Sequence, residues 1–228
     1  GRLIDPGNNI DDELDLGISG GQIAAVDKGL DLSVANQVYD ATGKLVVPGL
    51  IDLHAHCYLS VTPGGVDIDH YGLGRGVTTI IDAGSAGSDT FDDFRANAIE
   101  RFKTRVIAFL NISRVGLSVF RNKDGNELEH LACPEFINHA DCVNCLNANR
   151  DVIAGVKVLL SAALADDGRN EAKAFREALQ AAVTTATPLM THHAQSTISI
   201  DECPGSMRAG DIYTHCYHGF ESTIIDPQ

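Results

Sequence analysis

Apolar and polar positions follow two different rhythms along this chain. Over residues 1–47, short runs alternate apolar with polar residues and are separated by glycine-containing turns, as on half-buried strands. From residue 48 onward, short apolar runs alternate with longer segments in which apolar residues recur at helical spacing. The first rhythm predicts a separate small β unit at 1–47. The second predicts strand–helix repeats, an α/β architecture with a parallel sheet, over 48–228.

Two hairpins are expected in the amino-terminal part. Residues 14–18 and 22–26 flank a turn at Ser19-Gly20-Gly21, and residues 37–40 and 44–47 flank Ala41-Thr42-Gly43.

Six strands are expected in the second part. They are predicted at 47–56, 76–82, 105–110, 152–158, 187–192 and 211–215, with helices at 90–103, 133–147 and 170–185. The first of these strands, rich in leucine, isoleucine and valine, is expected to be buried. From the pattern alone, these strands and helices indicate βα units and a parallel sheet.

Two histidines end the first predicted barrel strand. His54 and His56 are two residues apart, so both rings point to one face of the strand, with Ala55 on the other. Neutral imidazole is a favoured ligand of zinc and similar metals. Two ordinary core or surface histidines would give the same spacing. The metal interpretation is preferred because other predicted strands carry matching groups.

Lys157 lies between two valines on the fourth predicted strand, so its side chain is expected to point inward. An unpaired buried ammonium would cost several kcal/mol, so this lysine needs a partner or a chemical change. The residues alone leave two other interpretations of Lys157. Its ammonium group could pair with a carboxylate from a distant part of the sequence, or it could reach solvent.

The motifs together resemble a known family. The stretch PGLIDLHAH at 48–56 closely resembles the first barrel strand of the amidohydrolase superfamily of metal-dependent hydrolases. GVKVLLS at 155–161, PLMTH at 188–192 and GDIYTHCYHG at 210–219 follow in the order of the hydantoinase and dihydroorotase branch. The last motif, with DECPG at 201–205, resembles a deacetylase-like subgroup.

This resemblance implies a (β/α)8 TIM-type barrel at 48–228, preceded by part of a small β-sandwich at 1–47. Such a barrel has eight strands over roughly 250 residues, so the chain is expected to be a barrel truncated at its C-terminus, with strands seven and eight missing. The resemblance also implies a site with two divalent metal ions, most simply zinc. It implies metal ligation by five residues: His54, His56, Lys157, His192 and His215. In this branch CO2 carboxylates the lysine, and the carbamate bridges the metals. The catalytic residue is a strand-eight aspartate, which would lie beyond Gln228, so the fragment alone is expected to be inactive.

Other candidate groups surround this set. His218 and Arg114 are candidate substrate-binding residues, although a solvated arginine is the simpler reading of Arg114. His193 is expected to point away from the metals, because neighbouring residues on a strand face opposite sides. The remaining histidines, His70, His130 and His139, are expected not to be ligands.

The predicted function is hydrolysis of an amide or ester bond, such as deacylation, by a hydroxide that two metals activate. A mononuclear amidohydrolase-type deaminase and a non-catalytic barrel scaffold are the alternatives. Lys157 argues against the deaminase, and the retained ligand set argues against the scaffold. The sequence does not name the acyl or leaving group.

Composition limits the partners and the cellular location that are expected for this protein. The chain has 228 residues and a formal net charge of −14, which disfavours nucleic acid and anionic membranes. No apolar run reaches the roughly 18 residues of a membrane span, and no signal peptide is expected. Six scattered cysteines, including a structural Cys142/Cys145 pair, suit a cytoplasmic protein. The expected partner is a small-molecule substrate, and a homo-oligomer is compatible with these features.

Overall fold

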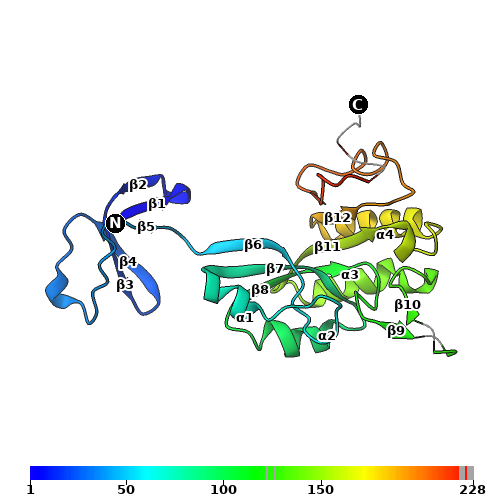
Figure 1. The fold of residues 1–228 in the computed structure, drawn as a ribbon, viewed down its shortest axis with the longest axis horizontal. Helices are drawn as coiled ribbons and strands as arrows, with labels where there is room; N and C mark the ends of the chain where they lie inside the picture. The colour runs from blue at the N-terminus through cyan, green and yellow to red at the C-terminus, as the bar shows by residue number, and fades with distance from the viewer. Residues whose placement is uncertain (122, 126, 221–223, 225–228) are drawn as a thin grey trace. The chain divides into compact units, whose positions relative to one another are not determined.

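The structure is a computed structural model that describes residues 1–121, 123–125, 127–220 and 224. The chain divides into two compact units, Gly1–Leu50 and Ile51–Gln228 (Figure 1). Within the described part, no helix combines the length and the apolar character that a membrane span requires.

The first unit consists of short strands. β1 (Arg2–Asp5) pairs antiparallel with β2 (Ile10–Glu13) and parallel with β5 (Leu45–Val46). β3 (Asp15–Ser19) and β4 (Gln22–Asp27) form a separate hairpin. Single 3-10 turns occur at Pro6–Asn8 and Leu32–Val34. The predicted hairpin at 14–18 and 22–26 is therefore confirmed, whereas a sandwich domain at 1–47 stays a prediction.

The second predicted hairpin, at 37–40 and 44–47, is wrong. Residues 37–40 form no strand, because the Asp40 carboxylate accepts a hydrogen bond from the Thr42 backbone N–H at 2.9 Å and begins a tight turn instead. The turn closes with the Lys44 N–H donating to the Ala41 carbonyl at 2.9 Å. Strand β5 then pairs with β1 rather than with the segment before it.

The second unit is built on a six-stranded sheet with the order β13-β12-β11-β8-β7-β6 (Figure 1). The strands are β6 (Leu50–Ala55), β7 (Val77–Gly87), β8 (Arg105–Asn111), β11 (Ile153–Leu160), β12 (Leu189–His193) and β13 (Ile212–Thr214). The sheet is parallel and curled, so the strands form a half-barrel. All six strands predicted from the sequence are present, and the half-barrel confirms the predicted α/β fold class of the (β/α)8 type.

Helices connect the strands and cover the outer face of the sheet. They are α1 (Ile68–Tyr71), α2 (Phe91–Phe94), which continues as a π-helical turn (Arg95–Ile99), α3 (His139–Ala148) and α4 (Glu171–Thr185). Single 3-10 turns lie at Leu73–Arg75, Pro134–Phe136 and Ala162–Leu164. A small hairpin of β9 (Phe120–Arg121) and β10 (Glu127–Leu128) follows β8.

The two faces of the sheet have separate cores. Ile80, Leu110 and Leu189 belong to the large core on the helix side. Ala83, Phe109 and Met190 form a second, small cluster. Because neighbouring residues of a strand point to opposite faces, this small cluster lies on the inner face of the half-barrel. The inner face is therefore filled only in part by apolar side chains, which leaves room for polar groups nearer the carboxyl ends of the strands.

The expectation that the first barrel strand is buried is wrong for this structure. Leu50, Ile51 and Leu53 of β6 are 55%, 58% and 67% exposed. The physical reason is position: β6 is an edge strand, and no strand pairs with its outer side among the described residues.

Candidate functional site

The inner face of the half-barrel carries three of the predicted ligands. Ala55 packs against the outer core, so His54 and His56 on either side of it face inward. The same alternation places His192 on the inner face with Met190.

Lys157 faces inward by the same rule. Its neighbours Val156 and Val158 are both buried in the outer core, so the lysine between them points to the other face. In the register of the sheet, Lys157 lies beside Asn111 of β8 and Met190 of β12.

The histidine rings meet although they come from distant parts of the chain. The ring centroids of His54 and His56 are 5.6 Å apart, and His215 lies 4.7 Å from His54 and 4.7 Å from His192. His215 directly follows β13 with a φ of 59°, a left-handed conformation that a residue other than glycine adopts only at a cost. The His215 ring thus lies close both to His54 of the first barrel strand and to His192 of the fifth.

Lys157 is the unusual group of this site. Its side chain is only 1% exposed, and its Nζ has no hydrogen-bond partner among the described residues. Burial lowers the pKa of Lys157 to about 7, against an opposing effect of the Asp82 charge. A large fraction of this lysine is therefore a neutral amine near neutral pH, with a free lone pair.

Gly84 of β7 provides the space for the lysine stem. A Cβ at Gly84 would lie 2.4 Å from Cγ and 2.7 Å from Cβ of Lys157. The Asn111 side-chain amide donates to the Gly84 carbonyl at 3.0 Å and fixes this strand end beside the lysine. Only glycine at this position lets the chain of Lys157 pass.

The rings around the lysine are uncharged at neutral pH. Burial, followed by the charge of Lys157, lowers the pKa of His54 to about 3 and that of His192 to about 3. Burial also lowers the pKa of His56 and of His215. Neutral imidazole offers a lone pair, so the rings have the protonation state of metal ligands.

The chemistry of these residues fits a metal site, although their side chains do not enclose a single ion. Within the described ranges, no group of three or more His, Cys, Asp and Glu side chains is arranged to hold one ion. The rings meet in pairs, and the Nζ of Lys157 has no hydrogen-bond partner among the described residues. A carboxylated lysine would supply a further oxygen-bearing ligand, so the donor set fits the group that the sequence implies.

The other candidates already have partners inside the chain. The ring nitrogens of His193 bind the Tyr213 hydroxyl and the Ile198 carbonyl, both at 2.9 Å. The Arg114 guanidinium makes two hydrogen bonds to Asp89, at 2.9 and 3.1 Å.

His218 contacts the His193 carbonyl through Nε2 at 2.9 Å. Substrate-binding roles for Arg114 and His218 stay predictions.

His130 lies nearer to the site than its position in the sequence indicates. It is 5% exposed, its Nε2 lacks a hydrogen-bond partner in the described part of the chain, and burial lowers its pKa to about 4. Its charge is also one of the smaller causes that lower the pKa of His192. The loop that carries His130 is held by Ser113, whose hydroxyl donates a hydrogen bond to the His130 carbonyl at 2.5 Å.

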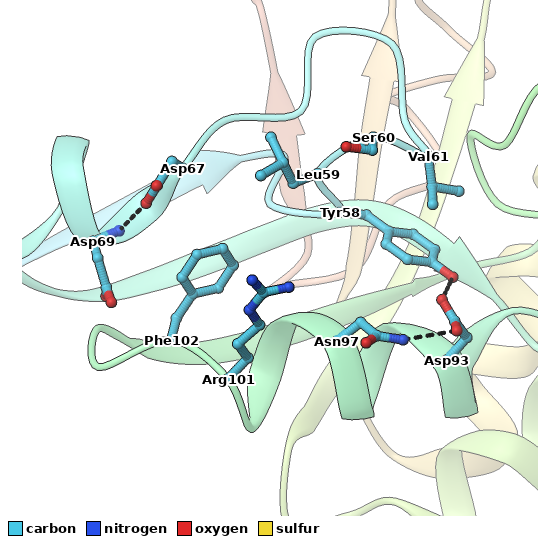
Figure 2. Close-up of a pocket in the computed structure, with 10 residues that line it drawn as sticks. All are labelled: Tyr58, Leu59, Ser60, Val61, Asp67, Asp69, Asp93, Asn97, Arg101 and Phe102. Atoms are coloured by element: carbon cyan, nitrogen blue, oxygen red, sulfur yellow. Dashed lines mark hydrogen bonds between the residues drawn. The ribbon is translucent and has the colours of Figure 1, made fainter.

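A separate pocket lies away from this set. It has a volume of about 470 Å³ and lies between the loop after β6 and the helical segment after β7 (Figure 2). The Tyr58 hydroxyl donates to Asp93 at 2.5 Å, and Asn97 donates to the same carboxylate at 2.8 Å. None of the predicted metal ligands lines this pocket.

Comparison with known proteins gives two kinds of relatives. No protein-family profile matches the chain. A deacetylase of Agrobacterium fabrum is 32% identical over 205 residues, which cover 90% of this chain and 49% of that protein. A deacetylase of Enterococcus faecalis is 28% identical over 214 residues, covering 93% of this chain and 55% of the relative. The chain thus spans about half the length of these curated relatives.

Solved structures agree with these sequences. A dihydroorotase superimposes with a TM-score of 0.82 at 30% identity, over 96% of this chain and 56% of that chain. An adenine deaminase superimposes with a TM-score of 0.74 at 26% identity, over 93% and 55% of the two chains. The fold is therefore that of the amidohydrolase barrels. The chain belongs to the amidohydrolase superfamily, in its hydantoinase- and dihydroorotase-like branch, and is deacetylase-like within it.

Proposed function

We propose that the protein is a metal-dependent hydrolase that cleaves a non-peptide amide or an ester bond, with deacylation as the leading reaction. The observation that carries this proposal is the buried, unpartnered Nζ of Lys157 on the same face as the ring cluster. A structural lysine would have a carboxylate partner. A lysine that is to be carboxylated needs a neutral amine and vacant space around Nζ.

Five residues would hold two divalent ions, which we propose to be zinc: His54, His56, Lys157, His192 and His215. When bound, such ions lower the pKa of a water molecule towards about 7 and polarise a carbonyl group. In this scheme, the neutral amine of Lys157 would add to CO2 and release one proton. The side chain would then end in a carbamate with one negative charge, in place of an ammonium group with one positive charge. This anion would offset part of the positive charge in the buried site.

The chain's own groups have distinct tasks in this scheme. The half-barrel presents the ligands on an inner face that also carries Phe109 and Met190, and Met190 lies beside Lys157 in the register of the sheet. The leaving group needs a proton donor. An aspartate at the end of an eighth strand is predicted for this role, and no residue of this sequence is assigned to it.

The two alternatives have less support. A mononuclear deaminase has no need for a bridging lysine, yet Lys157 is buried among the histidines. A barrel that serves only as a scaffold has no need to keep uncharged rings in contact with each other. A small-molecule substrate, a cytoplasmic location and a homo-oligomer remain parts of the proposal.

The test is a substrate screen with the intact protein that carries this sequence. N-acyl amino acids, cyclic amides and acyl esters are assayed with zinc and bicarbonate present. The proposal predicts hydrolysis of at least one class, abolished in Lys157→Ala and retained in Lys173→Ala. Lys173 is a suitable control because it is a half-buried lysine of α4 whose Nζ donates a hydrogen bond to the Pro134 carbonyl at 2.6 Å, away from the histidine rings. Equal activity of Lys157→Ala and the wild type would overturn the proposed role of the lysine.

A further inference from the structure

Asp82, in the middle of the second barrel strand β7, is the most heavily bonded side chain near the site. The carboxylate is fully buried and accepts hydrogen bonds at both oxygens. Oδ1 accepts from the backbone N–H groups of Gly84 and Ser85, at 3.1 and 2.7 Å. Oδ2 accepts from the Cys57 N–H at 2.9 Å, from the Cys57 thiol at 3.3 Å and from the Ser85 hydroxyl at 2.7 Å. Every partner is a donor, so Asp82 acts only as an acceptor.

The Ser85 hydroxyl connects this carboxylate to the histidine cluster. Its Oγ lies 3.0 Å from Nδ1 of His56, and Ser85 is itself fully buried. A hydroxyl has one proton, and in Ser85 that proton points to Asp82. The contact with His56 must therefore run in the other direction, with the Nδ1–H donating to Ser85.

We propose that Asp82 and Ser85 are positioning residues that hold His56 as its Nδ1–H tautomer. The order of donors is then His56 Nδ1–H to Ser85 Oγ–H to Asp82 Oδ2. Nε2 carries the free lone pair, and the hydrogen bond fixes the plane of the ring. This inference rests on the proposed function only in making a metal ion the partner of Nε2.

Among the described residues, this hydrogen-bonded arrangement holds one of the predicted metal ligands, His56. No hydrogen bond to a ring nitrogen of His54, His192 or His215 occurs among the described residues, whereas His56 has one. The same short segment therefore orients one ligand through Ser85 and makes room for another through Gly84.

The first experiment needs no metal and no activity. Long-range proton–nitrogen NMR of the intact, metal-free protein with labelled histidine reports which nitrogen of each ring carries the proton. We expect His56 to be the Nδ1–H tautomer in the wild type. In Ser85→Ala, the proton should distribute over both nitrogens. A wild-type His56 protonated at Nε2 would overturn the inference, whether or not any variant folds.

The second experiment measures zinc affinity by competition with a chelator. Ser85→Ala should weaken the binding of one zinc ion by about 10–100-fold, the usual effect of removing an outer partner of a metal-bound histidine. Ser85→Thr, which keeps a hydroxyl, should restore part of the loss. Thr185→Val is the matched control, because Thr185 is also buried but its hydroxyl contacts the Ala181 carbonyl at 2.8 Å and the Thr187 hydroxyl at 2.9 Å.

The outcomes separate the two proposals. Wild-type affinity in Ser85→Ala, with an unchanged His56 tautomer, would contradict the positioning role while leaving the metal site in place. A wild-type protein that binds no zinc would contradict the proposed function, and the tautomer measurement would then decide the inference alone. An equal loss in Thr185→Val would show that Ser85→Ala acts through general destabilisation and would also count against the inference.

Discussion

Substitution of Gly84 by alanine tests how closely β7 and Lys157 are fitted to each other. The new Cβ would lie 2.4 Å from Cγ of Lys157, a separation far inside van der Waals contact. Gly84 also has a φ of +89°, where an L-residue is strained. The backbone strain should cost roughly 1–2 kcal/mol. The overpacking should add about 1–3 kcal/mol, because the lysine stem must leave its place.

Gly76→Ala is the matched control for this prediction. Gly76 has a φ of +85°, close to that of Gly84, but a Cβ there would meet no atom within 4 Å. The control should therefore lose only the backbone contribution. Urea unfolding of the intact protein gives both free energies, and zinc affinity reports on the displaced lysine. Equal losses of stability in the two variants, with unchanged zinc affinity, would refute the proposed fit between Gly84 and Lys157.

Three further predictions concern the site and the cysteines. His56→Ala should remove more than half of the bound metal, measured by elemental analysis. The control His70→Ala, at an exposed position on α1, should remove none. Full retention of metal in His56→Ala would contradict the ligand assignment. Lys157→Ala should lose turnover, and short carboxylic acids that mimic a carbamate should restore part of it; activity without them would count against the carbamate. In the native protein, thiol reagents followed by mass spectrometry should label the half-buried cysteines before the buried ones, and the reverse order would contradict the fold. The half-buried set is Cys133, Cys145 and Cys216, and the buried set is Cys57, Cys142 and Cys203.

Much of the barrel could be predicted from the sequence, because strand alternation is a local property. Val156 and Val158 reveal that Lys157 faces inward, and Ala55 does the same for His54 and His56. The order of the strands then follows from the parallel topology.

Features that depend on distant contacts could not be predicted. The exposure of Leu53 depends on which strands pair beside β6, and a strand pattern does not contain that information. Gly84 reads as a turn residue, and only the fold shows that it borders Lys157. His130 lies in a loop without a regular pattern, so its burial near His192 had no signal in the sequence.

Asp82 is a case in which a signal existed but was ambiguous. A polar segment of aspartate, glycine and serine closes an apolar strand, which is typical both of a turn and of a site. The choice depends on what the serine touches, and that partner, His56, lies far away in the sequence.

The most direct test of the central claim is the metal content of the intact protein after loading with zinc and removal of the excess. Elemental analysis, with protein concentration from amino-acid analysis, gives the number of ions per chain. The arrangement of His54, His56, Lys157, His192 and His215 predicts two zinc ions per chain in the wild type, and a lower value in Lys157→Ala. A content of one ion or none in the wild type, or two ions in Lys157→Ala, would contradict a two-metal site bridged by this lysine.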